Sequence, residues 1–100
     1  MERTIHNYDY IVGVTIPIAR KYGVDRVSLF GSRARGEESE TSDYDFLISR
    51  GDIRTLIQLA GFIEELEEAF GVPVDVVTDT SNDLSFLEKI KEDEVVLYER

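Results

Sequence analysis

The sequence predicts a single α/β domain, and three features of the chain lead to this fold class. Short runs rich in Val, Ile, Leu and Phe alternate with stretches that carry apolar residues at helical spacing. Glycines and a proline stand at the ends of these runs, where strands and helices commonly stop. The chain of 100 residues is too short to bury two independent cores, so we expect one domain over residues 1–100.

Four apolar runs are predicted to be strands. Glycines follow the first two runs closely, and the third is a nearly unbroken β-branched segment. The fourth lies near the C-terminus, and we expect it at an edge of the sheet. The predicted strands cover residues 27–30, 45–49, 74–78 and 95–98.

Two helices are predicted after the second and third strands. Between residues 56 and 70, apolar side chains recur every three or four residues while four glutamates cluster elsewhere, as in an amphipathic helix. Gly71 and Pro73 follow at the positions that stop a helix. A shorter helix over residues 84–91 has three candidate N-caps, which are Ser81, Asn82 and Asp83.

The N-terminal segment gives conflicting signals. Six of the eight residues from 11 to 18 are β-branched and another is Pro17, so propensity alone indicates a strand. Residues 19–22 followed by Gly23 instead resemble a helix C-terminus with its capping glycine. We favour a helix that is kinked at Pro17 or begins near it.

The composition limits the location and partners of the protein. Eleven basic and twenty-one acidic residues give a net charge of −10, which disfavours a long nucleic-acid substrate. Most of the excess carboxylates are expected to do no more than keep the surface soluble. The sequence has no apolar run long enough to cross a membrane and no secretory signal, so we expect a cytoplasmic protein.

Two carboxylates stand one residue apart at the start of the second strand. Side chains at positions i and i+2 share one face of a strand, so Asp43 and Asp45 point together while Tyr44 points the other way. Such close carboxylates repel each other unless a cation neutralises them, and their oxygens suit Mg²⁺ or Mn²⁺. A solvated Ser-Asp-Tyr-Asp turn is the alternative when this motif is considered alone.

A third carboxylate, Asp75, interrupts the valine-rich run at 74–78. Three acids on neighbouring strands could hold two ions, which together position a triphosphate, activate a hydroxyl and stabilise the leaving oxygen. Asp75 could also be an edge-strand residue that faces water.

The turn after the first strand carries groups suited to phosphate. Gly31 and Ser32 can bring backbone amides and a hydroxyl close to phosphate oxygens, although a Gly-Ser turn is common. Arg33 and Arg35 are a close basic pair, and guanidinium groups match phosphate geometry. Either arginine could instead pair with the glutamates that follow, which are Glu37, Glu38 and Glu40.

The joint pattern resembles the DNA polymerase β-like nucleotidyltransferase superfamily. It consists of Gly31-Ser32 after a strand, ten intervening residues, Asp43-x-Asp45 on a second strand and Asp75 on a third. The Gly-Ser-Arg-Ala-Arg-Gly form is similar to the minimal nucleotidyltransferases, or MNT domains, that are paired with HEPN-domain toxins. The resemblance covers nearly the whole chain, and Tyr44 departs from the aliphatic residue that is common there.

The resemblance implies a mixed sheet of about four strands with helices packed on one face. It also implies Asp43, Asp45 and Asp75 as catalytic metal ligands for Mg²⁺, Gly31 and Ser32 as the triphosphate site, and ATP as substrate. The expected function is AMP transfer to a hydroxyl, such as a tyrosine of a HEPN toxin. The alternatives are a non-catalytic antitoxin that inhibits its partner sterically and a transferase for a small molecule or RNA. The sequence leaves the acceptor and the oligomeric state open.

Overall fold

The computed structural model describes residues 7–37, 42–80 and 82–100, and within these ranges it contains one sheet and four helices. The strands form a four-stranded sheet in the order β3-β2-β1-β4. The helices are α1 (Tyr8–Tyr22), α2 (Ser32–Arg35), α3 (Leu56–Phe70) and α4 (Leu84–Asp93), and the strands are β1 (Arg26–Phe30), β2 (Tyr44–Ser49), β3 (Val74–Thr78) and β4 (Val95–Glu99).

The sheet is mixed, as expected. Strand β1 pairs antiparallel with β2 and β4, whereas β2 and β3 run parallel and are joined through α3. All four predicted strands are confirmed to within one residue at each end, and β4 lies at an edge.

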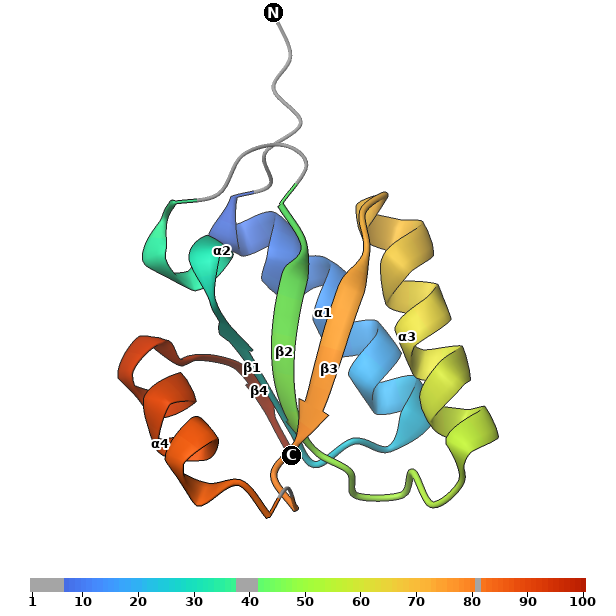
Figure 1. Cartoon of the computed structure of the whole chain (residues 1–100). Coiled ribbons are helices and arrows are strands. Elements are labelled where there is room, and N and C mark those ends of the chain that lie inside the picture. The colour runs from blue at the N-terminus through green and yellow to red at the C-terminus, as the bar shows by residue number, and fades with distance from the viewer. Residues whose placement is uncertain (1–6, 38–41, 81) are drawn as a thin grey trace, which may run out of the picture.

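Helices α1 and α3 cover one face of the sheet (Figure 1). The main core lies between them and the strands, and its fully buried members include Tyr44, Phe46 and Phe62. Helix α4 lies on the other face, where Phe86 contacts Phe30 edge to face at 6.4 Å. It covers only part of this second face and leaves much of β2 and β3 open toward the viewer (Figure 1). We call this second side of the sheet the open face.

The favoured N-terminal helix is confirmed as α1. It begins well before Pro17, so the alternative of a start near that residue is wrong. The Asn7 side chain accepts a hydrogen bond of 2.8 Å from the Tyr10 amide, which satisfies an amide of the first turn. Apolar contacts then outweigh the strand propensity, because Val12, Val14 and Ile18 pack against the core. The helix runs through Pro17 and ends at Gly23, whose φ of 69° is the expected left-handed cap.

The other two predicted helices are confirmed. Helix α3 begins after a capping box between Thr55 and Gln58 and ends at Gly71. Helix α4 extends two residues further than expected, to Asp93. Of its three candidate caps, Asp83 accepts a hydrogen bond from the Phe86 amide at 3.0 Å, and Ser81 lies outside the described residues.

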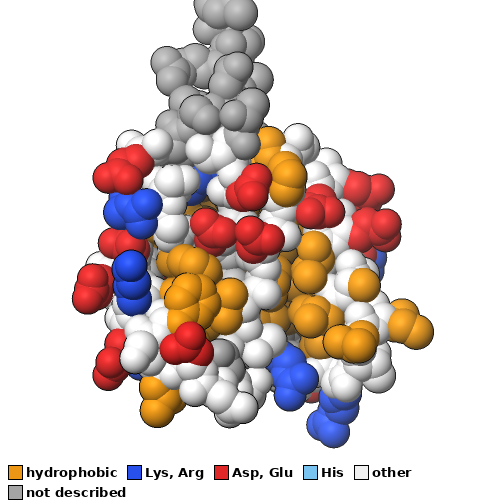
Figure 2. Space-filling model, in the orientation of Figure 1, with side chains coloured by type: hydrophobic (Ala, Val, Ile, Leu, Met, Phe, Trp, Pro, Cys, Tyr) orange, Lys and Arg blue, Asp and Glu red, His pale blue; other side chains and the backbone are white. Residues whose placement is uncertain are grey.

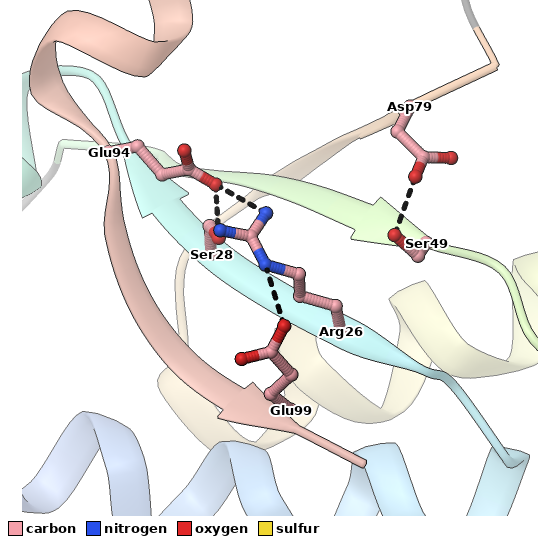
Figure 3. Close-up of polar contacts among 6 residues, drawn as sticks. All are labelled: Arg26, Ser28, Ser49, Asp79, Glu94 and Glu99. Atoms are coloured by element: carbon pink, nitrogen blue, oxygen red, sulfur yellow. Dashed lines mark hydrogen bonds and ion pairs between the residues drawn. The ribbon is translucent and has the colours of Figure 1, made fainter.

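A polar network ties the edge strand β4 to β1 (Figure 3). The Glu94 carboxylate accepts hydrogen bonds from the Ser28 hydroxyl at 2.5 Å and from Arg26 Nη1 at 2.7 Å. Arg26 also lies 3.6 Å from the Glu99 carboxylate. Ser28 is fully buried, and this bond satisfies its hydroxyl inside the protein.

Arg33 fixes the segment that leads into β2. Its Nε and Nη2 both donate to the Ser42 carbonyl oxygen, at 3.0 and 2.6 Å. Its guanidinium carbon lies 4.0 Å from the centre of the Tyr44 ring, which stacks on Phe70 at 4.1 Å. Arg33 is only 7% exposed, so these contacts operate away from water.

Gly31 makes the turn between β1 and α2 in a backbone conformation that other residues rarely adopt, with φ 79° and ψ −158°. A Cβ atom at this position would overlap the carboxylate of Asp45. The absence of a side chain therefore lets the turn approach Asp45 directly.

We expect Arg33→Ala to lower the free energy of unfolding by about 2–3 kcal/mol, because it removes charge-assisted hydrogen bonds and the contact with Tyr44. Urea unfolding followed by circular dichroism measures this loss. Arg50→Ala, at an exposed arginine, is the control and should change stability by less than about 0.5 kcal/mol. Equal stability of the two variants would contradict a structural role for Arg33.

Gly31→Ala should lower the free energy of unfolding by about 2 kcal/mol or more, because backbone strain adds to the overlap with Asp45. Gly36→Ala is a matched control, since Gly36 has φ 75° but no atom within 4 Å of the added Cβ. That control should lose only about 1 kcal/mol in the same unfolding measurement. If Gly36→Ala costs as much as Gly31→Ala, the close approach to Asp45 does not matter for stability.

Candidate functional site

Asp45 and Asp75 lie side by side on the open face. They are register partners on the parallel strands β2 and β3. Val74 and Val76 pack against the core, so Asp75 points to the opposite side and is exposed. Tyr44 is fully buried on the core side, which confirms that it and Asp45 point in opposite directions. The exposed Asp43 stands just before β2.

Neighbouring carboxylates act electrostatically on Asp45. Partial burial raises the pKa of Asp45, the charges of Asp75 and Asp43 raise it further, and the charge of Arg35 acts in the opposite direction. Because the folded pKa is raised, ionised Asp45 costs stability. This cost in stability grows as the pH rises from the unfolded pKa through the folded pKa, and it is fully present above the folded pKa. A bound cation would remove it.

The donor set fits a hard divalent cation, because carboxylate oxygens are the ligands that Mg²⁺ and Mn²⁺ prefer. The arrangement is not a finished metal site, however. Within residues 7–37, 42–80 and 82–100, no group of three or more acidic or histidine side chains is positioned to hold a metal ion. The predicted ligands Asp43, Asp45 and Asp75 therefore lie near one another, but their carboxylates do not converge on a single position where a metal ion could bind.

Gly31 and Ser32 stand next to these carboxylates. Phe30, the last residue of β1, is the register partner of Asp45, and the turn follows directly. Gly31 is the N-cap of the short helix α2, and Ser32 is its first residue. The predicted phosphate-binding turn and the acidic residues thus share one end of the sheet.

The two arginines of the turn are engaged by the protein. Arg33 commits Nε and Nη2 to Ser42, so those two groups would have to leave that carbonyl to reach a phosphate. Arg35 pairs with Glu37 and with Asp93 of α4, both at 2.9 Å. The alternative pairing with Glu37 is therefore present, whereas Glu38 and Glu40 lie outside the described residues.

Sequence patterns did not identify the residues that α4 contributes to this region. Asp93 and Phe86 reach the turn only because α4 folds onto the open face beside β1. Figure 2 shows the result: acidic side chains gather in the middle of the face, with hydrophobic side chains directly beside them. The residues of α4 carry no motif of their own, so no local signal could have placed them here.

The chain is similar to known proteins of one family. The family described as "Polymerase beta, Nucleotidyltransferase" matches residues 15–100. A Methanocaldococcus jannaschii protein named "Putative protein adenylyltransferase" is 47% identical over 75 residues, which cover 75% of this chain and 81% of that protein.

Two solved structures share the fold. A "putative minimal nucleotidyltransferase" has a TM-score of 0.76 and 29% identity and covers 90% of this chain and 95% of its own. A Shewanella oneidensis MNT antitoxin complex with a tri-AMPylated HEPN toxin has a TM-score of 0.72 at 18% identity, over 94% of this chain and 74% of that chain. The family model spans most of the sequence, including both aspartate strands and the glycine turn. The chain therefore belongs to the polymerase β-type nucleotidyltransferase family, and it is an enzyme of the protein adenylyltransferase group.

Proposed function

We propose that this nucleotidyltransferase transfers AMP from ATP to a tyrosine hydroxyl of a HEPN-domain toxin and so acts as its antitoxin. The observation that carries the proposal is the pair Asp45 and Asp75, which face the same side beside the turn Gly31-Ser32. The names of the relatives support AMP as the transferred group and a HEPN toxin as the partner.

Asp43, Asp45 and Asp75 would hold Mg²⁺, with two ions expected and Mn²⁺ as a substitute. Bound there, the metal would neutralise charge on the phosphates and on the attacking oxygen. Gly31 and Ser32 would hold the triphosphate through backbone and hydroxyl groups. We assign Arg33 a positioning role, because it fixes the residues before β2 and hence the place of Asp43 and Asp45.

In the reaction, the tyrosine oxygen attacks the α-phosphorus of ATP. A bond forms between these two atoms while the bond from the α-phosphorus to the β-bridging oxygen breaks. Pyrophosphate leaves, and the hydroxyl proton passes to water. The folded chain contributes orientation, because the attacking oxygen and the phosphate must approach in line. The open face leaves the acceptor free to come from a second protein.

Steric inhibition without catalysis is the second candidate function. It is favoured by one observation: the described carboxylates are not arranged as a finished metal site. The placement of Asp45 and Asp75 side by side next to the Gly31-Ser32 turn favours catalysis instead. Burial and the charges of Asp75 and Asp43 raise the pKa of Asp45, and a pure binding protein gains nothing from that cost. We therefore retain AMP transfer as the main proposal.

The net charge supports a proposal for the partner of this protein. No helix in the described part of the chain could cross a bilayer. We propose a cytoplasmic protein whose partner is basic, because a chain with a net charge of −10 attracts a positively charged surface. Nucleic acid is disfavoured for the same reason.

Asp45→Asn should separate the stability and activity roles of this residue. Without divalent metal, relief of repulsion should leave the variant as stable as the wild type or up to about 1 kcal/mol more stable, since solvent partly screens these charges. Saturating Mg²⁺ should raise the melting temperature of the wild type more than that of the variant. Nucleotidyl transfer should fall by about a hundredfold or more.

Asp79→Asn is the matched control for this experiment. Its amide oxygen can still accept the hydrogen bond that Asp79 receives from Ser49 at 2.5 Å (Figure 3). This variant should keep both the wild-type response to Mg²⁺ and the transfer activity. Strong destabilisation of metal-free Asp45→Asn with intact transfer would show that Asp45 is a folding residue.

Association with the partner toxin should depend on salt. We expect the dissociation constant to rise about tenfold or more between about 0.05 and 0.5 M salt, because screening weakens attraction between oppositely charged surfaces. Calorimetric titration of the two proteins at several salt concentrations measures this dependence. An affinity that stays constant across the series would argue against an electrostatic interface.

A further inference from the structure

A cavity of about 240 Å³ opens beside the glycine turn, between β1 and α4. One wall comes from the end of β1 and from α2, and the other comes from a single side of α4. Gly31 belongs both to this wall and to the proposed triphosphate site. The lining residues are Phe30, Gly31, Arg35, Phe86, Lys89, Ile90 and Asp93.

The lining of the cavity is mostly apolar and aromatic. Phe30 and Phe86 meet edge to face, with ring centres 6.4 Å apart and planes at 86°. Ile90 is only 3% exposed, whereas the large Phe86 ring remains 41% exposed although it lies next to an apolar cavity. An aromatic ring that is partly buried on one side and open on the other provides a surface for a flat ligand.

Charged groups border the cavity without filling it. Arg35 and Asp93 hold each other at 2.9 Å across the gap between α2 and α4. Lys89 is exposed, and within the described residues no ion pair joins its ammonium group to an acid. An apolar cavity with Lys89 at its edge suits a ligand that has a flat apolar part and a negatively charged part.

The cavity lies next to the proposed triphosphate site, and this position indicates which ligand it would bind. Phe30 is the register partner of Asp45, so the cavity begins one strand away from the carboxylate at which the α-phosphate would react. Figure 2 shows hydrophobic side chains directly beside the acidic group on this face. A nucleotide whose phosphates lie along Gly31 and Ser32 would have its base within reach of Phe86.

We propose that the cavity between β1 and α4 binds the base of the nucleotide substrate, with Phe86 as the stacking surface. This inference rests on the proposed function, which places ATP at the turn. Phe86 is thus a binding residue that contacts the base of the substrate, and α4 forms part of the nucleotide site. The occupant is the purine base, and an apolar side chain of the partner protein is the competing occupant that the test must exclude.

The test compares Phe86→Ala with the wild type in calorimetric titrations against two probes, Mg²⁺-ATP and inorganic tripolyphosphate with Mg²⁺. Base stacking on an aromatic ring contributes enough affinity that its loss should weaken ATP binding by about tenfold. Tripolyphosphate has no base, so its affinity should change less than about twofold. Leu84→Ala is the control, because Leu84 is 71% exposed on the same helix and does not line the cavity.

Amide NMR spectra of the wild type provide a second measurement that does not depend on the stability of a variant. Mg²⁺-ATP should shift the resonances of Phe86, Lys89 and Ile90, whereas tripolyphosphate should shift only those near Gly31 and Ser32. The inference would be overturned if Phe86→Ala weakened the binding of both probes equally, or if the ATP affinity were unchanged and no resonances of α4 shifted. Weaker binding of the partner alone would assign the cavity to protein docking and would also overturn it. A wild type that binds neither probe would refute the proposed function together with this inference.

Discussion

The parallel register between β2 and β3 is the constraint on which the site depends. It places Asp45 beside Asp75, whose charge helps to raise the pKa of Asp45. A shift of one residue would relieve this contact but would turn Tyr44 out of the core and bury Asp45 in its place. Because Tyr44 is fully buried, that exchange is far more costly than the repulsion, so the strained carboxylates persist.

The helices cover the two faces of the sheet unequally, and this leaves the carboxylates of β2 and β3 accessible. Helices α1 and α3 cover one face, and the stacked rings of Tyr44 and Phe70 fix β2 there. On the other face, the short helix α4 covers only the side near β1 (Figure 1). The acidic groups therefore remain accessible on a rigid strand, which favours reaction with large partners. Arg33 extends the rigidity to the residues just before the strand.

Local patterns predicted much of this arrangement. The β-branched segment at residues 74–78 and the apolar periodicity at 56–70 matched the observed strand and helix, because pattern and packing agree there. The alternative start of α1 near Pro17 was wrong, because the β-branched residues of this helix pack against the core. Secondary-structure propensity does not describe such packing. The spacing of Asp43 and Asp45 predicted a shared face. Their closeness to Asp75, the commitment of Arg33 to Ser42 and the contact of Phe86 with Phe30 depend on tertiary pairing and carry no local signal.

The central claim is that the carboxylates on β2 and β3 direct transfer of a nucleotidyl group and not of the terminal phosphate. The most direct measurement incubates the protein and its partner toxin with Mg²⁺ and ATP that is radiolabelled at either the α- or the γ-phosphorus. We expect the α-label to become covalently attached to the partner, while the γ-label is released in pyrophosphate. Attachment of the γ-label, or of neither label with wild-type protein that binds ATP, would contradict this claim.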